Sequence, residues 1–319
     1  MSRPDLTRAA LLGLALLGWS PTSDASPAIP APATCSVDSL VAEVRAGLVN
    51  GSPAYRRYLA RLFREAAADL PESTLAAAFA RESDPAMIEV LGAAMAGRSD
   101  RIDDPTTLRS VAERARADAN PRVRAAAVRA LGETSALEQV PEVYRQLARD
   151  PAREVREAVA HNLVVDNREV YSGHHAPVAD LAVGIAVASR DPAMTATILG
   201  DLSLEAASPA ATDSILPLLD SDEVAVRAAA VLALGGAAAA SAAEVRIALL
   251  EHFPGEPQRA VRVAILQSIA RLGFAGAIPD LRRLRAIDSS LGHEVDVWIR
   301  ALGLGLQEWS LILREKQRL

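Results

Sequence analysis

Apolar and small residues along this chain recur at the spacing of one face of an α-helix. In the segment that begins at Val123, offsets 0, 3, 4, 7 and 8 hold valine, three alanines and leucine, and arginine holds offsets 1 and 6. Side chains at the first set of offsets share one side of a helix. The same ten-residue phrase returns at Val226 with little change. The pattern predicts amphipathic helices that bury a face of small and branched apolar side chains.

Weaker copies of this phrase set a period along the chain. Two of them follow a shared Asp-Pro-Ala-Met sequence. The first buried positions of the seven copies, called column residues below, are Met87, Val123, Val155, Met194, Val226, Val261 and Val295. Their successive gaps are 36, 32, 39, 32, 35 and 34 residues, which is typical of a stacked helical solenoid. We therefore expect about seven to eight helical hairpins within residues 37–319.

Capping residues, prolines and glycines between the copies predict where helices begin and end. Four helix starts carry a capping side chain just before a proline, at Asp84, Asn120, Asp150 and Asp191. A side-chain oxygen before a first-turn proline satisfies free backbone N–H groups at a helix start. Gly132 and Gly235 follow the last leucine of their copies, and we predict that both adopt the left-handed conformation that ends many helices.

The repeated phrase resembles that of the HEAT repeat family, in which the second helix of each pair carries aspartate, then Val-Arg, then Ala and Leu-Gly. The resemblance covers about Met87 to Gly303. It implies an all-α, right-handed α-α superhelix, and a ladder of polar contacts between successive units. The implied ladder arginines are Arg124, Arg156, Arg227 and Arg262, with Asn120, Asp150 and Asp222 as partners. Ile88 and Thr195 stand where two further arginines would be, so interruptions are expected there.

The amino-terminal residues have the features of an export signal. Two arginines precede an apolar run from Ala9 to Trp19, which is too short for a comfortable membrane span. We expect a signal peptide over 1–25, a Pro/Ala-rich linker over 26–36, and a periplasmic or secreted protein. Cys35 is the only cysteine, so an internal disulfide is excluded. Acylation of Cys35 is not favoured, because residues 32–34 differ from the usual lipoprotein signal.

Composition narrows the range of functions. Half of the residues are hydrophobic but only 3% are aromatic, and the net charge is −6. A core of alanine, leucine and valine between thin helices accounts for the shortage of rings. Nucleic acid is not an expected partner, because phosphate binding requires a clustered basic surface.

The two ends of the repeat region are expected to be capping units. Residues 37–49 and 53–70 would form a first hairpin, in which Tyr55, Tyr58, Leu62 and Phe63 are spaced to share one buried stripe. An aromatic peptide-binding patch is the alternative. Trp298 and Trp309 indicate a second capping unit, since terminal repeats must present a polar, solvent-exposed outer face.

One cluster of metal-capable side chains keeps a second class of function open. His174 and His175 lie in the widest gap, and His161 precedes them. A metal-binding or HEAT-like enzyme would use this region, but no spacing there matches a zinc or calcium motif. A hydroxylase-type di-iron centre needs several adjacent His-Glu pairs as ligands, and this chain has one such pair, at His293. A bilin lyase-like activity would rest on the repeat alone. We expect no cofactor and no catalysis.

A partner surface is the remaining prediction. The resemblance implies that second helices line a concave face where partners dock. Six residues after their columns stand Arg129, His161, Leu232 and Gln267, which we predict to bind a polypeptide. The row would be polar and basic between the first two residues and more apolar after Gly200. In the alternative interpretation, several of these side chains only fill space between units.

Overall fold

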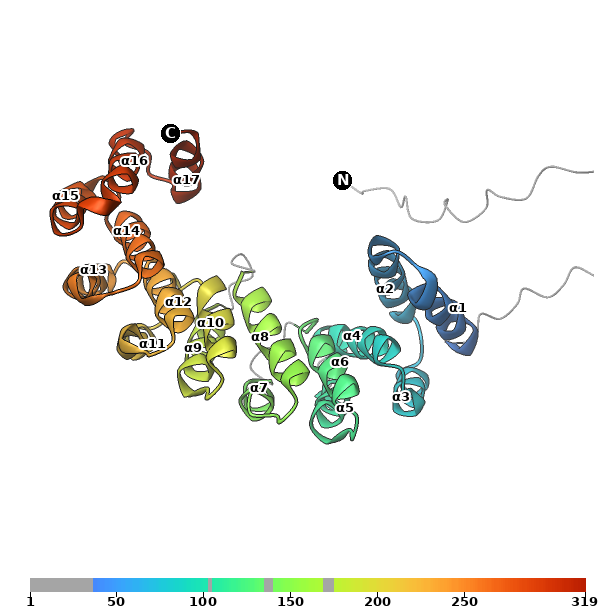
Figure 1. The fold of residues 1–319 in the computed structure, drawn as a ribbon. Helices are drawn as coiled ribbons and strands as arrows, with labels where there is room; N and C mark the ends of the chain where they lie inside the picture. Colours follow the sequence, from blue (N-terminus) through green and yellow to red (C-terminus); the bar gives the residue numbers. More distant parts are fainter. Residues whose placement is uncertain (1–36, 103–104, 135–139, 169–174) are drawn as a thin grey trace, which may run out of the picture. The chain divides into compact units, whose positions relative to one another are not determined.

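The computed structural model describes residues 37–102, 105–134, 140–168 and 175–319 of the chain. In these ranges the regular structure is helical and contains no strand (Figure 1). Residues 37–319 form one compact unit. The predicted signal peptide, the linker with Cys35, and His174 lie outside the described residues. The side chains of residues 166–168 and of His175 are not described either.

The helices of the described ranges follow one another through short connections. They are α1 (Val37–Asn50), α2 (Pro53–Ala67), α3 (Glu72–Arg81), α4 (Pro85–Ile102), α5 (Pro105–Ala117), α6 (Pro121–Leu131), α7 (Pro141–Leu147), α8 (Arg153–Arg168), α9 (His175–Ala188), α10 (Pro192–Asp201), α11 (Pro209–Ile215), α12 (Val224–Leu234), α13 (Ala242–His252), α14 (Arg259–Gly273), α15 (Ile278–Ile287), α16 (Gly292–Gly303) and α17 (Trp309–Arg318). Short 3₁₀ segments are η2 (Leu216–Asp220), η3 (Phe253–Gly255), η4 (Phe274–Ala277) and η5 (Ser289–Leu291).

Residues 37–319 form a two-layer stack of helical pairs (Figure 1). Each even-numbered helix from α2 to α14 packs on the next even-numbered helix, and each odd-numbered helix from α1 to α15 packs on the even-numbered helix that follows it. The final helix, α17, packs on α16. All seven column residues lie near the starts of α4 to α16 and are at most 4% exposed. The all-α solenoid predicted from the repeat is confirmed.

Three of the four predicted helix caps lie where the sequence placed them. Asn120 accepts a hydrogen bond from the N–H of Arg122, Asp191 accepts from Ala193 and Met194, and Asp84 accepts from Met87. Asp150 is the exception, because α8 begins only at Arg153. Its carboxylate binds an arginine of the preceding unit and the N–H of Ala152 instead.

The prediction of left-handed glycines is wrong at both positions. Gly132 has φ −68° and Gly235 has φ −61°, which any residue can adopt. Packing explains the glycines instead: a Cβ atom on Gly132 would lie 2.9 Å from the side chain of Asn162, and one on Gly235 would lie 2.5 Å from the Oγ of Ser268. Both neighbours belong to the next even-numbered helix, so each glycine permits a close approach between units.

The space left by each glycine is occupied by a hydrogen bond between units. The Asn162 Nδ2 donates to the carbonyl of Val128 at 2.6 Å, and the Ser268 Oγ donates to the carbonyl of Val231 at 2.8 Å. Both donors stand seven residues after their column residue, and both acceptors stand five after theirs. Asn162 and Ser268 are 4% and 1% exposed, so these bonds satisfy polar groups inside the core.

The amino-terminal unit corrects one prediction. Of the expected stripe, only Phe63 is buried, whereas Tyr55 and Tyr58 are each 49% exposed and Leu62 is 42% exposed. On α2 the buried positions are Phe63 and Ala67, which stand one helical turn apart. The two tyrosines stack on each other on the opposite side, with ring centroids 6.4 Å apart.

The carboxy-terminal unit is closed by aromatic packing. Trp298 of α16 is fully buried, and the ring of Trp309 from α17 stacks on it with centroids 5.5 Å apart. Phe274 meets Trp309 edge-on, and the Lys316 Nζ lies 4.4 Å from the centroid of the Trp298 ring. This arrangement agrees with a capping unit, because α17 covers a ring that would otherwise face water.

Within the described residues, one helical stretch is long and apolar enough to cross a membrane, Arg259–Ile287. It comprises α14, η4 and α15, and Phe274 at its centre has φ 47°. Leu266 and Leu281 lie in the core of the solenoid. Length and composition alone also select such core helices of a repeat protein.

Candidate interaction surface

A ladder of arginines joins successive units along one edge of the stack. Each ladder arginine follows a column residue, bonds a backbone carbonyl just before its own helix, and pairs with a carboxylate of the next unit. The rungs are Arg124 with Asp150, Arg156 with Asp191, Arg227 with Glu256, and Arg262 with Asp288. We call this side, where odd-numbered helices turn into even-numbered ones, the ladder edge.

All four predicted arginines are ladder members, but two of their predicted partners are wrong. Asp222 offers Arg227 only its backbone carbonyl, at 3.3 Å. The carboxylate of that rung comes from Glu256, whose side chain is completely buried. Asn120 caps its own helix. Sequence reasoning looked for partners before each arginine, whereas the carboxylates come from the unit that follows.

The ladder is interrupted at the two places where the sequence lacks arginine. Ile88 is fully buried among apolar neighbours. The hydroxyl of Thr195 donates to the carbonyl of Ala186 at 2.9 Å, within its own helical pair. Near the first gap, Arg114 of α5 donates to the carbonyls of Phe79 and Glu82, so a different helix supplies the guanidinium.

The rungs change the titration of their carboxyl groups. Burial alone would raise the pKa of Glu256 and of Asp150, but hydrogen bonds from arginine and from backbone N–H groups outweigh it, and each pKa lies below its ordinary value. The pKa of Asp191 is lowered chiefly by its hydrogen bond from Arg156. These carboxylates are therefore charged in the folded protein at neutral pH.

The four predicted partner-binding residues occupy equivalent places in the layer of even-numbered helices. Arg129 lies on α6, His161 on α8, Leu232 on α12 and Gln267 on α14. We call the exposed side of this layer the even-helix face. His161 is exposed, and the other three are partly buried. Equivalent positions in a stacked repeat form a row, so the fold aligns side chains that are up to 138 residues apart in the sequence.

The amino-terminal part of this row is polar. The Arg129 Nε lies 2.7 Å from the Glu89 Oε2 of the preceding unit, with side chains 39% and 44% exposed. His161 borders a small groove between α8 and α10, which is also lined by Glu157 and Thr197. The Arg129 pair is exposed enough for solvent to weaken it, so a partner can compete for the guanidinium.

The carboxy-terminal part of the row is more apolar, although it ends in the polar Gln267. Leu232 is half-buried, and Val224 on the same helix is 38% exposed. Small residues continue this character where α10, α12 and α14 begin, at the exposed Ala193, Ala225 and Ala260. Ala93 and Ala301, which stand six residues after the first and the last column residue, are buried. At these two ends of the row the side chains therefore fill space between units, as in the alternative interpretation.

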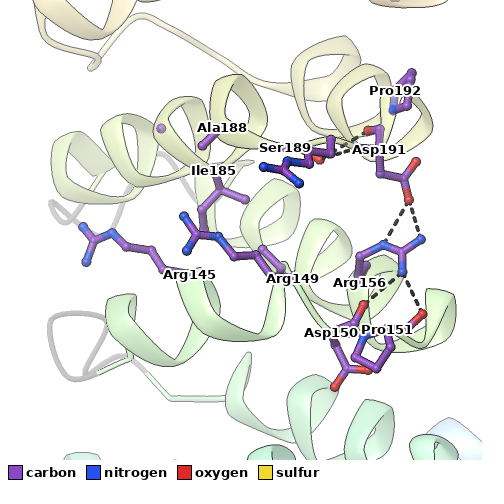
Figure 2. A pocket seen from close by; sticks show the side chains of 13 residues that line it. Arg145, Arg149, Asp150, Pro151, Arg156, Ile185, Ala188, Ser189, Asp191 and Pro192 are labelled. Carbon is purple, nitrogen blue, oxygen red and sulfur yellow. Dashed lines mark hydrogen bonds and ion pairs between the residues drawn. The ribbon is translucent and has the colours of Figure 1, made fainter.

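Sequence reasoning did not identify a hollow beside the ladder edge. Figure 2 shows its lining, which includes Arg145, Arg149 and the rung between Arg156 and Asp191. A signal for it exists in the sequence: the phrase Arg-Asp-Pro occurs at 149–151 and again at 190–192. Two successive units therefore carry an extra arginine at the same turn.

The described residues contain no group of three or more side chains able to hold a metal ion. His161 lies on the even-helix face, while His174 is outside the described residues. His293 is exposed on α16, and its neighbour Glu294 pairs with Lys316 at 2.6 Å. The described side chains thus assign no metal ligand.

The stacked helical pairs define a class, the all-α repeat solenoids. Residues 72–164 match the family model for HEAT repeats, which confirms HEAT repeats in this part of the chain, as the resemblance implied. YibA of Escherichia coli is 14% identical, covering 81% of this chain and 92% of its own, with a TM-score of 0.48.

A HEAT-like repeats protein of the archaeon Thermococcus onnurineus NA1 is 17% identical, covering 74% of this chain and 99% of its own, with a TM-score of 0.47. Human deoxyhypusine hydroxylase is 15% identical, covering 88% of this chain and 98% of its own, with a TM-score of 0.28. No curated protein matches the chain.

Proposed function

We propose that this HEAT-repeat protein is a non-catalytic scaffold that binds a polypeptide along its even-helix face. The observation that carries the proposal is the change of chemistry along this face, from the charged and polar side chains of α6 and α8 to Leu232 and Val224 of α12 and the exposed alanines at the starts of α10, α12 and α14. A row of this length suits an extended chain with a charged and an apolar part better than a small ligand.

The proposed place of action is the cell envelope. This part of the proposal rests on the arginines and the apolar run before residue 26. The lack of a catalytic constellation in the sequence supports a binding role, since no serine has a nucleophile-elbow setting and no glycine-rich loop follows a strand.

Site-specific photo-cross-linking in the native host tests the proposal. A photoreactive residue is placed at His161 or at Leu232, and matched controls carry it at Ile247 of α13 and Arg282 of α15, two exposed positions of the other layer. We expect the two even-helix positions to cross-link to the same polypeptide. Equal labelling from all four positions, or no adduct at all, would remove the even-helix face from consideration.

The predicted residues also have a direct test once that polypeptide is in hand. Replacing Arg129 and His161 together with alanine should weaken its binding and leave the free energy of unfolding nearly unchanged, because both side chains are exposed or half-buried. Unchanged affinity would exclude the polar part of the row.

A further inference from the structure

A hollow of 1110 Å³ opens beside the ladder edge, between α7 and α9. The Arg156–Asp191 rung borders it on one side, and Arg145 and Arg149 lie on the other (Figure 2). Ile185, Ala188 and the two prolines of the Arg-Asp-Pro phrases give it apolar walls. The hollow therefore combines charge with apolar surface.

The hollow exists because two neighbouring helices of the odd-numbered layer, α7 and α9, are separated from each other. Helix α7 has only seven residues and packs on α5 and α8, while α9 packs on α8, α10 and α11. No contact of similar extent joins α7 to α9. On the α9 side, Gly184 is exposed and lines the opening, and a Cβ atom there would meet no other atom within 4 Å. Glycine inside a helix costs stability relative to alanine, and no packing contact requires it here.

The arginines around the hollow are available for a ligand. Arg149 and Arg190 are exposed, and the described part of the chain offers their guanidinium groups neither an ion pair nor a hydrogen bond. Among the described residues, the Arg145 guanidinium has a single exposed contact, with Glu142 at 3.4 Å. The adjacent carboxylates do not compensate them, because Asp150 is held by Arg124 and Asp191 by Arg156. A positive patch thus stands on a chain of net charge −6.

The repeat itself produces this cluster. Arg149 and Arg190 occupy the same place in two consecutive Arg-Asp-Pro turns, and stacking brings equivalent turns to neighbouring positions. In the two preceding turns the corresponding residues are Ser83 and Ala119. Among these four turns, the arginine pair therefore occurs only in the two units whose odd-numbered helices, α7 and α9, are separated.

We propose that this hollow binds an acidic polypeptide segment whose carboxylates pair with Arg149 and Arg190 while its neighbouring side chains contact the exposed Ala188, Pro151 and Pro192. Arginine binds carboxylate through two parallel hydrogen bonds. The apolar walls favour a peptide over a small inorganic anion, which would leave them uncovered. The Arg156–Asp191 rung lines both this hollow and the groove beside His161, but the two proposals rest on different side chains and neither depends on the other.

Fluorescence anisotropy with the full chain tests the proposal. The probe is a labelled octapeptide in which glutamate alternates with alanine or leucine, and its control has glutamine in place of glutamate. We expect the glutamate peptide to bind and the glutamine peptide to fail. The double variant Arg149→Gln with Arg190→Gln should weaken binding by about tenfold or more, since the loss of even one charge-assisted hydrogen bond costs roughly that factor.

A matched control separates a site from general electrostatics. Arg282→Gln with Arg283→Gln removes the same charge from two exposed arginines of α15 whose guanidinium groups pair with no described residue, and should leave affinity nearly unchanged. Gly184→Leu fills the hollow without altering charge and should also weaken binding, with folding checked by circular dichroism. Equal losses in the two arginine variants, equal binding of both peptides, or no binding would overturn the proposal. Displacement by inorganic phosphate beyond the effect of matched ionic strength would likewise overturn it in favour of a small-anion site.

Discussion

The glycine at the end of α12 provides a sensitive test of how the units are packed. Gly235 has φ −61° and ψ −16°, a conformation that alanine adopts without strain, so backbone preference alone predicts that Gly235→Ala stabilises the protein by up to about 1 kcal/mol. The added Cβ atom would lie 2.5 Å from the Oγ, 2.7 Å from the Cβ and 2.8 Å from the Cα of Ser268. The space around the new Cβ atom, rather than backbone conformational freedom, therefore decides whether Gly235→Ala stabilises or destabilises the protein.

The packing cost exceeds the backbone gain. Because the Cα of Ser268 belongs to the backbone of α14, the contact is relieved only if α12 and α14 move apart. Overpacking of this kind costs about 1–3 kcal/mol. Weakening of the hydrogen bond from Ser268 to the carbonyl of Val231 in the variant adds about 1 kcal/mol to this cost. We therefore expect Gly235→Ala to lower the free energy of unfolding by about 2 kcal/mol, the difference of these terms.

Urea unfolding followed by far-ultraviolet circular dichroism measures this change. The control is Gly184→Ala on α9, where a Cβ atom meets nothing within 4 Å, and this variant should gain about 0.5–1 kcal/mol. Unchanged denaturant dependence is required for the comparison, because loss of cooperativity between repeats would alter the slope. If Gly235→Ala proves as stable as Gly184→Ala, the close approach of α12 and α14 is refuted.

Further predictions concern charge and the carboxy-terminal cap. Since the folded-state pKa values of the rung carboxylates are lowered, their stabilisation is complete above the unfolded-state values and is lost as pH falls below about 4; stability that rises on acidification would contradict this. Arg227→Ala removes the arginine partner of the buried Glu256 carboxylate, which among the described residues keeps only His252 at 3.4 Å and a backbone N–H, and should cost about 3 kcal/mol. Arg153→Ala removes only an exposed pair and should cost under about 0.5 kcal/mol; similar losses in the two unfolding curves would refute the difference. Trp309→Ala should cost about 3 kcal/mol and expose Trp298 to fluorescence quenchers, and quenching equal to that of the native protein would show that α17 does not cover this ring.

The local patterns determined much of the fold. Apolar spacing within each copy and the repeat of column residues were enough to predict stacked helical pairs, because both depend on neighbours in the sequence. Ladder arginines were identifiable for the same reason, since each directly follows a column residue. The predicted row of partner-binding residues was likewise placed by counting from the columns, although their role stays a prediction.

Contacts between units were decided only by the tertiary structure. Glu256 and Asp288 stand at different distances before their columns, so no fixed spacing identified them as rungs, and the reason for the two glycines appears only when Asn162 and Ser268 of the following helices approach. Tyr55 and Tyr58 lie on the exposed side of α2 because the buried side of that helix contains Phe63 and Ala67. The arginine hollow depends on the parting of α7 from α9. A sequence repeat specifies which faces can stack, whereas the distance and rotation between units depend on side-chain packing summed across the interface.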